Sequence, residues 1–141
     1  MITRDKTIVD LDISSFKEHP LEIAKILDIQ PSRIRLEGEL VYPNALIRHK
    51  ENGLEISSSL SSSHPFMEHI DSLLKILIPL KDKFKNLPST CEIILSCHIY
   101  IYEDSMPAIC LDAKTVNLLS DLNAEIDIDL YYLGSLRSDS N

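Results

Sequence analysis

The sequence predicts an α+β fold in which helices cover one face of an antiparallel sheet. Residues 91–102 alternate along the chain, with apolar side chains at every odd position from Ile93 to Ile101. Period two is the pattern of a strand with two unlike faces. Apolar residues recur at helical spacing in three other stretches, which strand-like stretches separate. Because burying an aliphatic side chain contributes about 1.5 to 3 kcal/mol, we expect residues 91–102 to lie centrally in the sheet.

A strand and a helix are expected at the start of the chain. Residues 7–13 alternate between apolar and polar side chains, which predicts a strand with an acidic outer side. Pro20 suits the first turn of a helix, and apolar residues then recur at helical spacing up to Ile29. We expect this helix to stop before Pro31.

A β-hairpin is predicted next. Residues 36–48 and 54–58 are strand-like, and Asn52-Gly53 between them favours the positive φ values that a tight turn requires. Pro43 indicates that the first of these strands is irregular or lies at an edge of the sheet.

A long helix is expected to open at Pro65. Pro79 must end or kink it, because proline removes an interior hydrogen bond at a cost of about 3 kcal/mol. A new turn is expected to start there and to carry Leu80 and Phe84 inward.

The chain is predicted to close with a third helix and a last strand. Asp112 is a good N-cap for the helix, and Asn123 suits a left-handed C-cap. The last strand is expected over residues 125–133. We expect a single domain over residues 1–134 and a disordered tail over residues 135–141.

The predicted order of elements is therefore β-α-β-β-α-β-α-β. Its first six elements match the split βαβ, ferredoxin-like arrangement, an antiparallel sheet with helices on one face. The last helix and strand would extend that sheet. One face of such a sheet can be left open to solvent or to a partner.

Size and charge disfavour several classes of protein. A chain of 141 residues buries enough surface to fold without a metal or disulfide framework, and its three cysteines form no C-x-x-C pair. The net charge of −8 disfavours binding to nucleic acid. The longest apolar run, residues 73–80, is too short to cross a membrane. Charged residues near the N-terminus do not match a secretory signal, so we expect a cytoplasmic protein.

A distinctive pattern of residues covers the first predicted helix, in the stretch HPLEIAKILDIQPSRIRLEG. The helix ends in Leu-x-Ile-x-Pro-Ser, and a glycine follows; the residues are Leu27, Ile29, Pro31, Ser32 and Gly38. This pattern resembles a bacterial family catalogued as domain of unknown function 4279. The similarity continues through the hairpin, the long helix and the segment LNAEIDIDLYYL. Members of the family usually show a tryptophan where this chain has Leu54. The resemblance implies the fold and implies no activity.

Acidic and aromatic side chains recur on the outer sides of three predicted strands. If the first, central and last strands share a sheet, four carboxylates lie beside a histidine and three tyrosines: Asp10, Asp12, Asp127, Asp129, His98, Tyr100, Tyr102 and Tyr131. Like charges across neighbouring strands are destabilising, so intervening residues must separate them, or lysines or a bound partner must neutralise them. Tyrosine offers large contact area at low entropic cost, and with carboxylates it suits the arginine or lysine of a protein partner. A merely solvated sheet face is the alternative.

The same carboxylates permit a metal site. Asp10 and Asp12, with Asp127 or Asp129, could hold Mg²⁺ for phosphoryl chemistry. No glycine-rich phosphate loop and no motif that fixes an attacking group accompanies them in the sequence. We therefore expect neither a catalytic site nor a cofactor.

The function that agrees best with these patterns is binding. We expect a small, acidic, cytoplasmic binding protein, an immunity protein that neutralises a cognate, basic bacterial toxin domain. A metal-dependent enzyme that uses the carboxylates of the open sheet face is one alternative. A homodimer built on that sheet is another.

Overall fold

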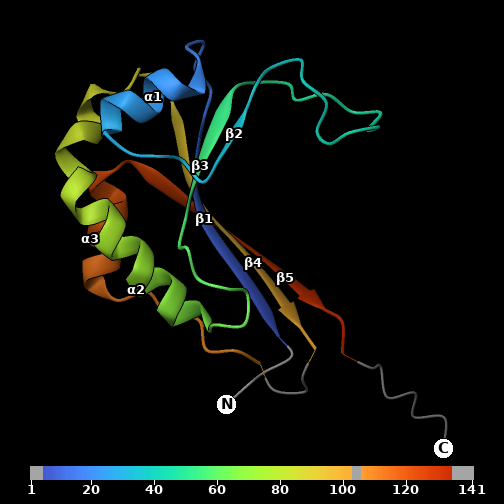
Figure 1. Cartoon of the computed structure of the whole chain (residues 1–141). Helices are drawn as coiled ribbons and strands as arrows, with labels where there is room; N and C mark the ends of the chain where they lie inside the picture. The colour runs from blue at the N-terminus through green and yellow to red at the C-terminus, as the bar shows by residue number, and fades with distance from the viewer. Residues whose placement is uncertain (1–4, 103–105, 135–141) are drawn as a thin grey trace, which may run out of the picture.

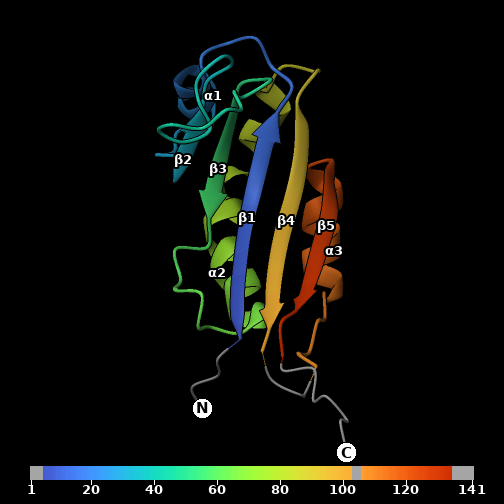
Figure 2. The same ribbon diagram turned by 90° about the vertical axis from the view of Figure 1, so that its right-hand side faces the viewer.

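A mixed sheet of five strands organises residues 5–102 and 106–134, the part of the chain that the computed structural model describes. The helices cover one face of this sheet (Figures 1 and 2). The elements are, in chain order, β1 (Lys6–Ser14), α1 (Pro20–Leu27), β2 (Arg33–Arg35), β3 (Gly53–Ser57), α2 (Phe66–Leu77), the 3₁₀ helix η1 (Ile78–Asn86), β4 (Glu92–Ile101), α3 (Ala113–Asp121) and β5 (Ala124–Tyr132). The tail expected over residues 135–141 lies outside the described residues.

The strand order in the sheet is β2-β3-β1-β4-β5. β1 lies at the centre and is antiparallel to β3 and β4, and β2 is antiparallel to β3. β5 is parallel to β4, because α3 forms a crossover that brings the chain back in the same direction. The α+β class predicted from the sequence is confirmed, and the sheet is mostly antiparallel. The expectation of a wholly antiparallel sheet is wrong for this last pair of strands.

The hydrophobic core lies between the sheet and the helices. The odd positions of β4, from Ile93 to Ile101, are all buried, as their alternation predicts. They pack with the apolar side of β1 and with the inward stripe of α2. A fully buried aliphatic side chain contributes about 1.5 to 3 kcal/mol, so this shared face holds the helices on one side of the sheet.

Proline and capping residues set the helix boundaries as predicted. α2 gives way to the 3₁₀ helix η1 at Pro79, and η1 buries Leu80 and Phe84. Asp112 caps α3, and Asn123 after its end has a φ of 57°. None of the helices in the described residues is both long enough and apolar enough to cross a membrane.

The hairpin predicted at Asn52-Gly53 is wrong, and so is the strand predicted over residues 36–48. β2 spans Arg33–Arg35 and pairs with β3 before the chain leaves the sheet. Gly53 is not among the residues with positive φ; it belongs to β3, opposite Arg35. The Asn52 side chain instead makes tertiary hydrogen bonds, which local turn propensity cannot anticipate.

Residues 36–52 form a projecting segment, which we call the arm. It leaves the body on the side away from the helices (Figure 1). The amide of Asn52 closes its base: Oδ1 accepts from the backbone N–H of Glu37 (2.8 Å), and Nδ2 donates to the carbonyl of Glu18 (3.0 Å). At its tip, Asn44 has a φ of 66°, and the N–H of Ala45 donates to the carbonyl of Tyr42 (3.0 Å). Proline followed by a positive-φ residue is typical of a type II turn.

A buried polar pair joins α2 to the serine-rich loop before it. His69 and Ser58 are both about 1% exposed, and Nδ1 of His69 lies 2.5 Å from Oγ of Ser58. Burial lowers the pKa of His69, and the neighbouring His64 lowers it further. Folding therefore favours the neutral imidazole.

Acid should weaken the fold through His69. In the unfolded chain its pKa is near the ordinary 6.5, so below that pH the unfolded state binds a proton that the folded state resists. Stability is then lost as the pH falls, by about 1.4 kcal/mol for each unit by which the pKa is lowered. We expect His69→Gln to be less stable than the wild type at pH 7.5 and the gap to narrow at pH 5. Urea unfolding at both values checks this, and a gap that is constant or widens would contradict it.

Candidate functional site

The face of the sheet opposite the helices carries the predicted site (Figure 2). β4 lies between β1 and β5 in the sheet, so the condition on which the predicted site depends is met. Tyr102 follows the end of β4, where its backbone N–H donates to Asp5 Oδ1 (2.7 Å). The registers bring the other predicted residues onto one surface, which we call the open face: Asp10, Asp12, His98, Tyr100, Asp127, Asp129 and Tyr131.

Cross-strand pairing keeps the carboxylates of β1 and β5 one strand apart. Ser96 of β4 pairs with Asp10 on one side and with Asp127 on the other. In the next row, His98 pairs with Asp129. Neighbouring strands lie about 4.8 Å apart, so a strand between two carboxylates roughly doubles their separation. The intervening residues of β4 therefore weaken the repulsion between these carboxylates. This is one of the three ways expected from the sequence.

Aromatic rings form a stack at the β4–β5 end of the open face. The rings of Tyr100 and Tyr131 lie 4.8 Å apart between centroids and 13° from parallel. His98 continues the stack at 6.3 Å from Tyr131. Its ring nitrogens have polar contacts, since Nδ1 lies 3.5 Å from Asp129 Oδ2 and Nε2 lies 3.3 Å from Ser96 Oγ. Ring stacking therefore fixes the faces of these side chains, and polar contacts fix the edge of the His98 ring.

Asp10 is the carboxylate with the least favourable surroundings. Burial raises its pKa above the ordinary value, and the negative charges of Glu55 and Asp12 add to the effect. A hydrogen bond from Ser57 and the nearby His98 oppose it without cancelling it. The fold therefore holds this carboxylate in a place where its negative charge is destabilising.

Two further ionisable groups, one on the open face and one in the core beneath it, remain protonated at neutral pH. Burial raises the pKa of Tyr131, and the charge of Asp129 raises it further. Burial also raises the pKa of Cys97 to about 12, with added repulsion from Asp10 and Asp127. Tyr131 is therefore a hydrogen-bond donor, and Cys97 is an unreactive thiol of the core.

Arg35 reaches the open face from β2, and no pattern in the sequence predicts this position. Its Nη1 lies 2.7 Å from Asp12 Oδ1 and 3.6 Å from Glu55 Oε1. The guanidinium lies across Gly53, where a Cβ would stand 2.0 Å from Arg35 Nη2. A Cβ at this position would therefore displace the guanidinium, whereas the φ of Gly53 is one that other residues can adopt. Arg33 adds a weaker contact, with Nε 3.7 Å from Glu55 Oε2.

The open face therefore has two electrostatically different halves. On the β2–β3 side, arginines answer Asp12 and Glu55. Elsewhere on the face, no lysine or arginine of the described residues forms an ion pair with Asp10 of β1 or with Asp127 and Asp129 of β5. We call this second region, with Asp10, Asp127 and Asp129, the acidic half. It combines carboxylates that have no lysine or arginine partner among the described residues with the aromatic stack.

The arrangement of acidic groups does not favour a metal centre. Within residues 5–102 and 106–134, no group of three or more His, Cys, Asp or Glu side chains is placed to hold a metal ion. Asp12, a ligand in the metal hypothesis, is engaged by Arg35, and Ser96 stands between Asp10 and Asp127.

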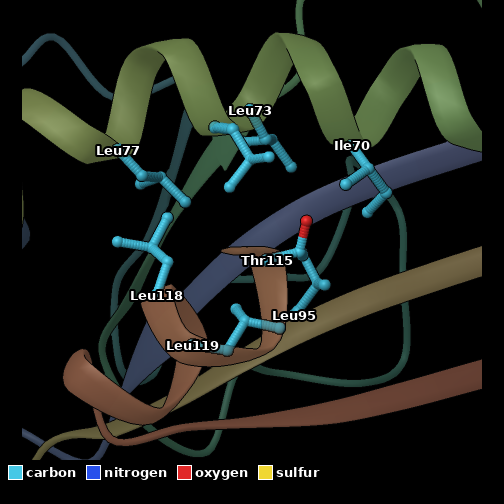
Figure 3. A pocket seen from close by; sticks show the side chains of 8 residues that line it. Ile70, Leu73, Leu77, Leu95, Thr115, Leu118 and Leu119 are labelled. Atoms are coloured by element: carbon cyan, nitrogen blue, oxygen red, sulfur yellow. The ribbon is translucent and has the colours of Figure 1, made fainter. Parts of the chain in front are cut away.

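The core also contains a small cavity between α2, α3 and β4 (Figure 3). Its volume is about 10 Å³, and its lining is almost wholly aliphatic, with Leu73, Leu95 and Leu118 among the residues that point into it. A cavity of this size is at the lower limit for one water molecule, and an apolar lining offers water no partners. It is a packing gap and not a ligand site.

Removing the Arg35 guanidinium should destabilise the protein through Asp12. We expect Arg35→Met to lower the free energy of unfolding by about 1 to 2 kcal/mol, since a partly buried carboxylate loses the guanidinium with which it forms an ion pair. Asp12→Asn in the same chain should recover most of that loss. A double-mutant cycle by chemical denaturation checks this. Additive effects of the two substitutions would show that the pair is not coupled.

Neutralising Asp10 should stabilise the free protein. Because its pKa is raised in the folded state, the folded state binds this proton more readily than the unfolded chain does. The contribution of Asp10 to stability therefore falls as the pH rises from 3.8, its ordinary pKa, through the raised value. We expect Asp10→Asn to stabilise by roughly 0.5 kcal/mol at pH 7 and to have no such effect below pH 3.8. Denaturation at the two pH values checks the sign, and a destabilised variant at pH 7 would contradict it.

Comparison with known proteins places the chain in a family. No curated protein and no solved structure matches it. The sequence model of the family described as Domain of unknown function (DUF4279) matches residues 5–133. This match spans every helix and strand of the described structure, from β1 to β5. The resemblance seen around the first helix is thus confirmed along the chain. The protein belongs to the DUF4279 family.

Proposed function

We propose that this chain is a small cytoplasmic binding protein, an immunity protein that neutralises a basic bacterial toxin domain by holding it on the open face. The acidic half is the centre of the interface, and Asp12 and Tyr102 lie at its margin. The observation that carries the proposal is the combination of carboxylates without a lysine or arginine partner in the described structure and a stacked pair of tyrosines. The proposed contact residues are Asp10, Asp12, His98, Tyr100, Tyr102, Asp127, Asp129 and Tyr131.

The position of Asp10 supports this role. A fold gains nothing from a half-buried carboxylate whose charge is unfavourable, and local destabilisation of this kind is typical of functional positions. A lysine or arginine of the partner would supply the missing positive charge. Binding would then offset the repulsion of Asp10 by Glu55 and Asp12. The repulsion that destabilises the free protein would thus increase its affinity for the partner.

The aromatic stack supports it in a different way. Tyr100 and Tyr131 are already fixed against each other, so little side-chain entropy is lost when a partner covers them. Tyr131 is 41% exposed and offers a ring edge and a phenol donor. Aromatic anchors beside charged groups are the usual composition of binding hot spots.

The overall charge of −8 adds long-range steering. An acidic surface raises the association rate with a basic protein and has a smaller effect on the dissociation rate. Binding should therefore weaken as the salt concentration rises.

The proposed fold type is the split βαβ, ferredoxin-like arrangement for β1 to β4. The strand order β2-β3-β1-β4 with antiparallel neighbours supports it. Such a sheet has helices on one face, and its other face is available to a partner. α3 and β5 widen that face on the side where the acidic half lies.

Recovery and rescue experiments test the function. The tagged chain is expressed from its native operon, the proteins that bind it are purified, and each is tested for toxicity. We expect a basic toxin domain that arrests growth and a wild-type chain that restores growth when co-expressed. Absence of any bound protein together with absence of rescue would refute the proposal.

Charge-reversal variants locate the interface. We expect Asp127→Lys with Asp129→Lys to abolish rescue and to weaken toxin binding at least about tenfold, since like charges then face each other. The matched control is Glu22→Lys with Asp71→Lys, which changes the net charge equally at exposed positions on α1 and α2. The control should bind and rescue as the wild type does. Equal losses in both variants would mean that net charge matters and the open face does not.

A further inference from the structure

The two edges of the sheet differ in how they are protected. β2 is three residues long and carries two arginines. β5 runs for nine residues, Ala124–Tyr132, and contains no proline, glycine, lysine or arginine. Figure 2 shows it along the margin of the sheet, and no strand of the described residues pairs with its outer side. Proteins often blunt an edge with lysines, prolines or bulges to prevent strand addition, whereas the charges on this edge are the carboxylates of Glu125, Asp127 and Asp129.

The outer side of β5 offers a regular row of backbone groups. The N–H of Leu133 donates to the carbonyl of Ile101 on β4 (2.7 Å), which fixes the direction of the alternation. Backbone groups alternate along a strand, so those of odd-numbered residues in β5 point toward β4. The N–H and C=O groups of Ile126, Ile128, Leu130 and Tyr132 therefore point outward.

The side chains of β5 define what a neighbouring strand must look like. On the open face the strand presents Asp127 and Asp129. On the other side, where α3 only partly covers the sheet, Ile126 is 41% exposed, Leu130 49% and Tyr132 50%. A strand that pairs with the outer edge of β5 would thus need positive charge on the open face and apolar side chains on the face toward α3.

We propose that β5 takes up an extended segment of the partner as a sixth strand, and that basic and apolar residues alternate along this segment. This inference rests on the proposed function and specifies how the partner is held. The basic residues lie opposite Asp127 and Asp129, and the apolar residues cover the exposed row behind them. Main-chain hydrogen bonds supply affinity in such strand addition, and the alternate side chains supply specificity.

A second copy of the same chain is a poorer occupant of this edge. If two β5 strands pair antiparallel about Ile128, Asp127 of each lies opposite Asp129 of the other. Like charges directly opposite each other across a strand pair are destabilising. A basic strand turns the same two positions into attractive pairs.

Synthetic peptides test the chemistry of the occupant on the full chain. The probe is a capped nonapeptide that alternates lysine and valine, and its control alternates glutamate and valine. We expect the lysine peptide to bind, the glutamate peptide not to bind, and the amides of Ile128 and Leu130 to exchange more slowly with solvent in the complex. Failure of the lysine peptide to bind at millimolar concentration, or unchanged exchange on binding, would overturn the proposal. Light scattering that shows a β5-dependent dimer would overturn it as well.

A proline substitution separates strand addition from simple charge attraction. Leu130→Pro removes an outward N–H that the sheet itself does not use, and Leu130→Ala removes the same side chain but keeps that donor. We expect the proline variant to bind the lysine peptide about tenfold more weakly than the alanine variant, which corresponds to the loss of one hydrogen bond. Equal binding by the two would overturn the proposal.

A second variant serves if the proline variant does not fold. Asp127→Lys with Asp129→Lys keeps the strand and should reverse the preference toward the glutamate peptide. An unchanged preference in that variant would overturn the proposal, because the charges at positions 127 and 129 would then not decide which strand binds.

The toxin itself distinguishes this inference from the function on which it rests. If the toxin binds the proline and alanine variants equally, strand addition is wrong and the immunity function stands. If no toxin is recovered although the peptides behave as expected, the function is wrong and the edge still accepts a basic strand.

Discussion

The structure depends on the burial of one face of β1 and β4. The odd-numbered side chains of both strands pack beneath the helices, and several, such as Leu11 and Ile99, are completely buried. Because side chains alternate along a strand, burying one set forces the other set onto the opposite surface. A shift in register by one residue would exchange the two sets, so the apolar core fixes the register. The carboxylates on the open face are therefore held there by the core and not by attraction among themselves.

Like charge gathered in this way has to be tolerated, and the two halves of the open face tolerate it differently. On one side Arg35 lies across the sheet and joins Asp12 to Glu55. On the other side distance is the means, because Ser96 keeps Asp10 and Asp127 apart. A carboxylate that is only kept apart from other carboxylates still attracts a cation of the partner. A carboxylate that is already paired with an arginine attracts such a cation much less. This difference is why the acidic half, and not the whole face, is the centre of the proposed interface.

Features that repeat along the chain could be predicted from the sequence, and features that depend on single distant contacts could not. The alternation in β4, the cap at Asp112 and the break at Pro79 each arise from neighbouring residues, so all three were found. The adjacency of β1, β4 and β5 could only be assumed, because alternation within a strand does not say which strands are its neighbours. The tertiary role of Asn52 could not be predicted, because its side-chain amide forms hydrogen bonds with residues that lie 15 and 34 positions away in the chain. Arg35 was missed because β2 has only three residues, too few for a period to appear.

Gly53 gives the electrostatics of the open face an unexpected point of control. It carries no charge and touches no partner in the proposed interface, yet its missing side chain is the space in which Arg35 lies. Any larger residue there would displace the guanidinium and uncover Asp12 and Glu55. The acidic surface would then widen toward β3 although every carboxylate stayed in place. One small-to-large exchange at Gly53 would thus change the charge that the open face presents to the proposed partner, with the proposed contact residues themselves unchanged.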